Sequence, residues 1–264
     1  MKPPADGARF VAERAGINLY SEQSLHSQLK EAYAEAGDRL ESPVLGKVVD
    51  LVKSDGELVE VQTKSLGKIA AKVLALAAAG HRVRIVHPVS VETSIRRIDP
   101  ATGEHLSTRR SPKRGDVYSV FEELVHASGL IAARNVSLEV VLVKTIETRS
   151  RDGSGSWRRR GDRTADRELA EILSSRVFSS RADWLRLIPR SLEPPWSSGS
   201  LGEALGIDAT RARQILYCFA KAALVSEEGR EGRRKLYSPA RAPARASARP
   251  AYSRKSSRGK GLEK

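Results

Sequence analysis

Two acidic residues, Asp50 and Glu60, carry the clearest chemical signal in the chain. They lie in two runs rich in Val and Leu that flank a turn signal, Ser54-Asp55-Gly56. In a three-residue hairpin loop the last position needs the left-handed backbone conformation, which glycine adopts at no steric cost. That register pairs Lys53 with Glu57 and therefore places Asp50 directly opposite Glu60. Opposite Cβ atoms lie only about 5 Å apart, and two carboxylates at that distance repel each other unless a cation lies between them. The pair therefore predicts a cation site.

Two alternatives use the same residues. A two-residue turn at Asp55-Gly56 would place Asp50 opposite Val61, on a mixed face, whereas the three-residue loop separates an apolar face from a face with the carboxylates. The apolar face then holds Val49, Leu51, Val59 and Val61, and the other face holds Val48, Asp50, Val52, Leu58, Glu60 and Gln62. The second alternative treats Glu60 and Gln62 as the solvent side of an ordinary amphipathic strand. Asp50 favours the chemical interpretation, because Asp is depleted in strands.

The hairpin lies within an α-β-β-β-α-β order of expected elements. Apolar spacing and turn residues predict these elements one after another. They are a helix over 21–36, strands near 40–44, 47–53 and 57–63, a helix over 66–79, strands over 82–87 and 91–98, a basic loop over 108–115, a helix over 117–127, a strand over 137–146 and a charged helix over 164–178. This order predicts a mixed sheet with helices packed on it.

The bulk composition is typical of a soluble globular protein. Of 264 residues, 40% are hydrophobic and 30% are charged. No stretch approaches the roughly 18 apolar residues of a membrane helix, and residues 1–7 lack the apolar core of a signal peptide. We therefore expect a cytoplasmic protein with no membrane partner. The single cysteine, Cys218, excludes an intrachain disulfide and a zinc site built from several cysteines.

The net charge of +14 lies almost entirely in the second half of the chain. Residues 1–150 hold 21 Lys and Arg against 19 Asp and Glu, whereas residues 151–264 hold 25 against 13. An excess of this size attracts polyanions, so we expect nucleic acid as the partner. The alternative is that the charge only keeps the protein soluble.

From Ser200 the chain resembles a winged helix. A short apolar helix, a turn at Gly206, a second helix and a polar hairpin over 226–235 follow one another. In such a domain the N-terminal half of the second helix enters the major groove, where Arg bonds guanine and Gln bonds adenine. The candidates there are Arg211, Arg213 and Gln214, and the hairpin cations that would meet phosphates are Arg230, Arg233, Arg234 and Lys235. Winged helices also mediate dimerisation, so a homodimer contact is the alternative.

Two other segments also suit contact with a polyanion. A Gly- and Ser-rich loop over 151–162 places Trp157 beside Arg158, Arg159 and Arg160, which suits phosphate or base contact. The alternative for this loop is a solvated linker. The tail over 239–264 has almost no large apolar residue, and we expect it to be disordered and to bind polyanions without sequence preference.

The stretch from Glu22 to about His87 resembles the PD-(D/E)XK nuclease superfamily. The residues that carry the resemblance are Glu22 on the first helix, Asp50 on the second strand and Glu60-Val61-Gln62 on the third. The resemblance implies that Asp50 and Glu60 bind Mg²⁺ through their oxygen atoms. It also implies that the metal polarises a DNA phosphodiester and helps to ionise the attacking water.

The match departs from the superfamily at one position. Gln62 stands where Lys is usual; its amide can orient water but supplies no charge, and Lys64, two positions on, is the candidate substitute. Glu22 could assist through a bound water or a second metal. For His26, one turn after Glu22, a packing or capping role is favoured. The whole chain also resembles a family of uncharacterised bacterial proteins, which implies no activity.

Together these patterns predict an α/β fold with a mixed central sheet and flanking helices, restriction-endonuclease-like, plus a small C-terminal winged-helix domain. The expected segments are a flexible leader over 1–18, the nuclease-like α/β domain over 19–178, a linker over 179–198, the winged helix-turn-helix over 199–238 and a basic disordered tail over 239–264. The expected function is association with nucleic acid and Mg²⁺-dependent hydrolysis of DNA phosphodiester bonds, and the expected partner is double-stranded DNA. The alternative, which Gln62 favours, is a non-catalytic DNA-binding or regulatory protein that uses the nuclease fold as a scaffold.

Overall fold

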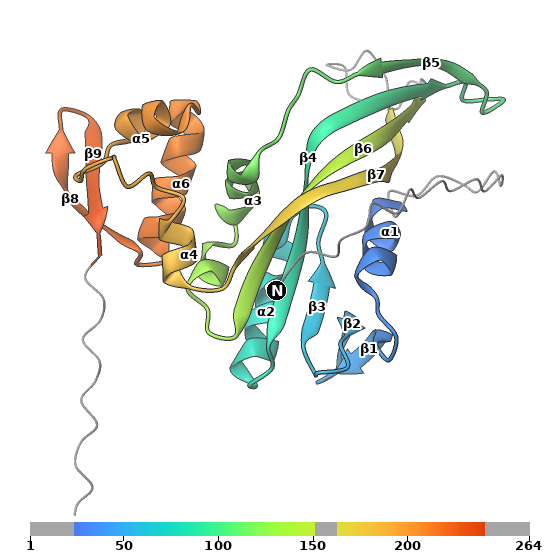
Figure 1. Cartoon of the computed structure of the whole chain (residues 1–264), viewed down its shortest axis with the longest axis horizontal. Helices are drawn as coiled ribbons and strands as arrows, with labels where there is room; N and C mark the ends of the chain where they lie inside the picture. The colour runs from blue at the N-terminus through green and yellow to red at the C-terminus, as the bar shows by residue number, and fades with distance from the viewer. Residues whose placement is uncertain (1–23, 151–162, 241–264) are drawn as a thin grey trace, which may run out of the picture.

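A computed structural model describes residues 24–150 and 163–240 of the chain (Figure 1). Its elements are α1 (Ser24–Tyr33), β1 (Arg39–Val44), β2 (Lys47–Val52), β3 (Leu58–Val61), α2 (Leu66–Ala78), β4 (Val83–Ile98), β5 (His105–Arg110), η1 (Val117–Val120), α3 (Phe121–Leu124), η2 (Ser128–Ile131), β6 (Val136–Ser150), β7 (Arg163–Phe178), α4 (Arg181–Leu185), α5 (Ser198–Leu205), α6 (Ala209–Lys221), β8 (Val225–Glu231) and β9 (Arg234–Pro239). Seven of the described strands form one sheet in the order β1-β2-β3-β4-β6-β7, and β5 pairs with β4. The β3–β4 and β4–β6 pairs are parallel, whereas the other pairs of this sheet are antiparallel. The predicted α/β class with a mixed sheet and flanking helices is therefore confirmed.

Two hydrophobic clusters cover the two faces of the sheet. Leu29 of α1 packs in one cluster with Val59 of β3. Val73 of α2 packs in the other cluster with Leu58, the neighbouring residue of β3. Because successive strand residues point to opposite faces, α1 and α2 lie on opposite sides of the sheet (Figure 1). Residues at the end of β3 therefore lie between two helices.

The predicted hairpin register is confirmed. Leu51 pairs with Val59 and Val52 with Leu58, while the loop glycine, Gly56, has a φ of +83°. The predicted face of one residue is wrong, because Val49 packs in the α2-side cluster instead of with Leu51. The regular pairing of β1 with β2 skips Asp50 and its opposite residue, Glu41, whose φ of +44° kinks β1 at this point.

The charged helix predicted over 164–178 is wrong, because this segment is strand β7. It pairs with β6 from Ser150–Arg163 to Leu138–Phe178. Its Ala, Glu, Leu and Arg residues favour a helix locally, but a long-range ladder overrides a preference of less than about 1 kcal/mol per residue. Other boundaries also differ, since the strands expected over 82–87 and 91–98 form the single strand β4, and β5 takes the first part of the expected basic loop. The helix expected over 117–127 is divided between η1 and α3.

Strand β4 has an interval along one edge that no strand occupies in the described structure. β3 pairs with β4 up to Val86, and β5 pairs with β4 only from Ser94 onwards. The loop after β5 lies along this interval, because Ser111 N donates to Thr93 O (2.8 Å) and Gly115 N donates to Ser90 O (3.0 Å). A Cβ at Gly115 would lie 2.7 Å from Ser90 O, so only glycine allows this close approach.

The C-terminal helices share the core of the α/β part. Phe219 of α6 packs edge-on against Phe121 of α3, with ring centroids 5.6 Å apart, and Phe121 also meets Trp184 of α4. The segment expected to be a linker thus contributes α4 and buried side chains to the core. Trp196 and Tyr237 exchange two backbone hydrogen bonds, which tie the chain before α5 to the β8–β9 hairpin. The helices in the described ranges are all too short and too polar for a membrane span.

A buried carboxylate on β6 yields a stability prediction. Glu147 is bonded by Arg149 (2.7 Å), Arg167 (3.1 Å) and Thr164 (2.9 Å). Burial acts to raise the pKa of Glu147, but these partners outweigh it and lower the pKa from 4.5 to about 2. The stabilisation is therefore complete above pH 4.5 and is lost as the pH falls toward 2. We expect Glu147→Gln to lower the free energy of unfolding by about 2–3 kcal/mol at pH 7.

Urea unfolding between pH 2 and pH 7 measures this effect. The difference between wild type and Glu147→Gln should shrink as the pH falls. Glu171→Gln removes a half-exposed carboxylate from β7 and serves as the control, with a loss below about 0.5 kcal/mol. A Glu147→Gln deficit that stays constant down to pH 2 would contradict the assignment.

Candidate functional site

Asp50 lies where β2 and β3 separate. Beyond the Leu51–Val59 pair, Asp50 Oδ2 accepts a hydrogen bond from Val61 N (2.8 Å), so its carboxylate takes the place of a backbone acceptor in the ladder. The same oxygen lies 3.2 Å from His26 Nε2 on α1. The side chain is 18% exposed. Asp50 is therefore fixed by a strand and a helix while it remains accessible to solvent.

Glu60, on β3, reaches toward the opposite helix. Its side chain is only 5% exposed, and Oε1 lies 2.5 Å from Lys72 Nζ of α2. The ammonium group of Lys72 therefore neutralises this buried oxygen. The strand positions of both carboxylates follow the prediction, but their side chains have partners on different helices. Lys72 was missed because the sequence does not show which residues of α2 face Glu60.

The two carboxylates differ in their electrostatic environment. Burial acts to raise the pKa of Asp50, but the hydrogen bonds from His26 and Val61 N and the charge of Lys30 outweigh it, so the pKa is lowered. Burial raises the pKa of Glu60, and the charge of Asp50 adds to this effect, although Lys72 opposes it. The predicted opposed pair is not formed, because the β2–β3 ladder does not pair Asp50 with Glu60 and the two side chains contact helices on opposite sides of the sheet.

Gln62 and Lys64, which were expected to orient the attacking water, have other surroundings than expected. Gln62 Nε2 donates to the carbonyl oxygens of Lys64 and Ser65, so its amide is bound by its own loop. Strand β3 ends at Val61, and Lys64 therefore does not continue the strand face on which it was expected. Glu22 lies outside the described residues. His26, which was expected to pack or to cap, instead contacts Asp50.

The basic residues of α6 divide into two groups. Arg211 forms ion pairs with Asp116 (3.1 Å) and Glu122 (3.4 Å), so it ties α6 to the α/β part. Arg213 is exposed and Gln214 half-buried. Four hairpin cations are exposed, namely Arg230, Arg233, Arg234 and Lys235. Arg158, Arg159 and Arg160 lie outside the described residues.

An exposed stripe on α6 was missed. Arg213, Tyr217 and Lys221 follow one another at intervals of four residues and are all exposed, and Lys221 Nζ lies 5.8 Å from the centre of the Tyr217 ring. Residues four apart share one helix face. The same spacing in the sequence could have identified this stripe.

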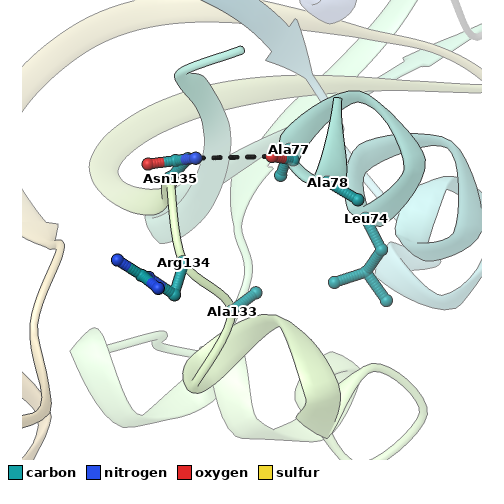
Figure 2. Close-up of a pocket in the computed structure, with 6 residues that line it drawn as sticks. All are labelled: Leu74, Ala77, Ala78, Ala133, Arg134 and Asn135. Carbon is teal, nitrogen blue, oxygen red and sulfur yellow. Dashed lines mark hydrogen bonds between the residues drawn. The ribbon is translucent and has the colours of Figure 1, made fainter. Parts of the chain in front are cut away.

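Two further features of the described structure bear on the site. Within residues 24–150 and 163–240, no three His, Cys, Asp or Glu side chains are grouped to hold a metal ion. A surface pocket lies at the C-terminal end of α2 (Figure 2). Its lining residues are Leu74, Ala77, Ala78, Ala133, Arg134 and Asn135, and Asn135 Nδ2 donates to Ala77 O (3.3 Å). None of the candidate site residues lines this pocket.

Comparison with known proteins shows one family model that covers most of the candidate site residues. A family model described as "Domain of unknown function (DUF8091)" matches residues 23–179. The chain belongs to this family. A protein of Treponema pallidum (strain Nichols) with the printed name "Uncharacterized protein" is 29% identical over 222 residues, which cover 84% of this chain and 86% of that protein. No solved structure matches the chain.

The DUF8091 match contains the whole candidate site at the end of β3. His26, Asp50, Glu60 and Lys72 all lie within it, whereas α4 to β9 follow its end at residue 179. The similarity to the Treponema protein covers 222 residues, whereas only 179 residues of this chain precede the end of the DUF8091 match. The similarity therefore extends into the C-terminal helices. The DUF8091 part and the C-terminal part are therefore related together to that protein.

Proposed function

We propose that the protein is a cytoplasmic, DNA-associated bacterial protein whose DUF8091 part hydrolyses phosphodiester bonds with Mg²⁺. The observation that carries the proposal is the site of Asp50 and Glu60 where β2 and β3 separate, with Lys72 beside Glu60. The order α1-β1-β2-β3-α2-β4 supports it, since a restriction-endonuclease-like fold has this order of elements.

The donor atoms fit a magnesium ion. Mg²⁺ is usually bound by one or two carboxylates and completes its octahedral shell with water and phosphate oxygens. Glu60 offers a buried carboxylate, whose Oε1 is ion-paired with Lys72, and Asp50 offers a second carboxylate where β2 and β3 separate. When bound, the metal would polarise the phosphodiester and lower the pKa of the attacking water.

Lys72 would supply the positive charge that Gln62 lacks. Its ammonium group lies 2.5 Å from Glu60 and is itself only 25% exposed, so its field is less screened by water than that of a surface lysine. A fixed ammonium group at this place stabilises negative charge that develops on the phosphate oxygens. His26 and Val61 N hold the carboxylate of Asp50 in one orientation.

The C-terminal part would bind the DNA as a winged helix. Helices α5 and α6, the β8–β9 hairpin and the Trp196–Tyr237 bridge support this assignment. With Arg211 held by acidic partners, the exposed stripe of Arg213, Tyr217 and Lys221 is the side of α6 that would enter the major groove. The hairpin cations would meet the phosphates of double-stranded DNA.

A second candidate function is DNA binding or regulation without catalysis. The binding of the Gln62 amide by its own loop favours it, as does the neutralisation of Glu60 by Lys72. In this case the site would stabilise the fold and would have no affinity for metal.

Thermal melting and cleavage assays of Asp50→Asn distinguish the two functions. We expect about 1 mM Mn²⁺ to raise the melting temperature of the wild type by several degrees, because a ligand that binds only the folded state stabilises it. The variant should show no such rise, and its cleavage of plasmid, linear duplex and single-stranded DNA should fall at least about 100-fold.

Asp55→Asn is the matched control, since it removes an exposed carboxylate from the same hairpin. It should keep both the Mn²⁺ effect and the cleavage activity. Retained cleavage in Asp50→Asn would contradict the catalytic proposal. Absence of both effects in the wild type, together with a more stable Asp50→Asn variant, would support the second candidate.

A further inference from the structure

The loop formed by the last two residues of β5 and the segment that follows them up to η1 carries a concentration of exposed positive charge. Its cations are Arg109, Arg110, Lys113 and Arg114, all exposed. Arg110 and Lys113 form solvent-exposed ion pairs with Glu92 (3.5 Å) and Glu122 (3.8 Å), which are screened by water and therefore weak. Arg109 and Arg114 donate to backbone carbonyls of the same segment. These contacts leave most of the charge available to an anion from solution.

The loop is held in a fixed position. Its backbone is bonded to β4 at Thr93 and at Ser90, and the close approach at Gly115 admits no side chain. Asp116 then accepts a hydrogen bond from Ser119 N and begins η1. A charged loop that is already ordered loses little conformational entropy when it binds.

The position of the loop relates it to the two parts of the proposed function. Gln62, at the end of β3, donates its N–H to Val86 O of β4. Ser90 and Thr93 follow on the same strand, about 13 and 23 Å away at 3.3 Å per residue. At its other end the loop reaches the Arg211 side of α6, because Glu122 lies near both Lys113 and Arg211, whereas the stripe of Arg213, Tyr217 and Lys221 lies on the other side of this helix. Figure 1 shows this segment running from β5 down to α3, which lies beside α6.

We propose that residues 109–114 bind the phosphate groups of a DNA duplex and extend the nucleic-acid surface along β4 from the Asp50–Glu60 site. The inference rests on the proposed function and adds a binding segment to it. The interval from the site to the loop is shorter than one turn of duplex, about 34 Å. A single duplex can therefore contact both places.

Salt-dependent binding tests the proposal. The full chain and a variant with Arg109→Gln, Arg110→Gln, Lys113→Gln and Arg114→Gln are titrated with a labelled 30-bp duplex in EDTA, by fluorescence anisotropy at several KCl concentrations. Each phosphate contact contributes about 0.9 to the slope of log K against log salt. We expect at least about tenfold weaker binding and a slope reduced by about 2 or more.

A control variant that loses the same number of positive charges from other parts of the protein tests whether the loss of net charge alone weakens binding. The control variant carries Arg39→Gln, Lys47→Gln, Arg82→Gln and Arg134→Gln, which lie on the β1–β2 hairpin or at the start of β4 and β6. It should bind within about twofold of the wild type. A third variant, Arg213→Gln with Lys221→Gln, tests α6 separately. If the fourfold loop variant is unstable, Arg109→Gln alone should lower the slope by about 1.

The outcomes separate the two proposals. Wild-type binding that ignores salt would overturn the DNA-associated function and the loop with it. Weak binding by the α6 variant, with the loop variant equal to the control, would overturn only the loop. A loop effect confined to single-stranded DNA or to an RNA duplex would overturn the assignment to duplex DNA.

Discussion

We expect Lys72→Gln to lower the proposed phosphodiester cleavage by about 100-fold or more, while the proposed binding of DNA in EDTA should stay within about twofold. The expectation follows from the ammonium group of Lys72, which is the cation that contacts Glu60 in the described structure. Loss of one fixed group that stabilises transition-state charge typically lowers kcat by 10²–10³. Cleavage under saturating DNA, with binding measured separately, isolates this effect on the chemical step.

Two companion variants make the result specific. Lys68→Gln removes an exposed lysine one turn earlier on α2 and should leave cleavage within about threefold. Gln62→Lys in the Lys72→Gln background restores an ammonium group to the end of β3 and should recover part of the activity. If Lys72→Gln alone retains more than about one fifth of wild-type cleavage, Lys72 has no role in the reaction.

Phe219→Ala lowers the free energy of unfolding by about 4 kcal/mol. The ring is fully buried and packs edge-on against Phe121. Removal of a buried Phe side chain typically costs 3–5 kcal/mol, because it loses hydrophobic contact and leaves a cavity. Since the aromatic cluster belongs to both parts of the chain, we expect one shared urea transition that moves to lower urea.

Tyr217→Ala is the matched control on the same helix. Tyr217 is 43% exposed, and its loss should change the free energy of unfolding by less than about 1 kcal/mol. Two separate transitions in Phe219→Ala, with only one displaced, would show that α6 and the DUF8091 part unfold independently.

The parts of the fold that depend on local chemistry could be predicted from the sequence. The hairpin register follows from Gly56 and the apolar alternation beside it, and both operate over a few residues. Asp50 and Glu60 could be identified for the same reason. The C-terminal end of α2 also follows a local signal, because Gly80, with a φ of +96°, comes directly after the C-cap residue Ala79.

The parts that depend on distant partners could not be predicted. Strand β7 has helix-forming residues, and its identity comes from a ladder with β6 that no local preference indicates. Arg211 has the position of a base-reading residue, but Asp116 and Glu122 lie about 90 residues earlier in the chain. Lys72 likewise gains its importance from Glu60, on the strand before its helix. Sequence periodicity identifies which side of a helix or strand is exposed or buried. It does not identify which distant residue packs against that side.

The aromatic cluster of Phe121, Trp184 and Phe219 has a consequence for how this family can evolve. The DUF8091 match ends at residue 179, yet Phe121 on the near side of that boundary is covered by rings from the far side. A gene shortened at the boundary would encode a protein with an exposed aromatic surface, which favours aggregation. Relatives that carry DUF8091 without the C-terminal helices should therefore have a polar residue at the position of Phe121, or a different segment that covers it. The segment that the family model covers ends at residue 179, whereas the hydrophobic core that stabilises it continues into the C-terminal helices.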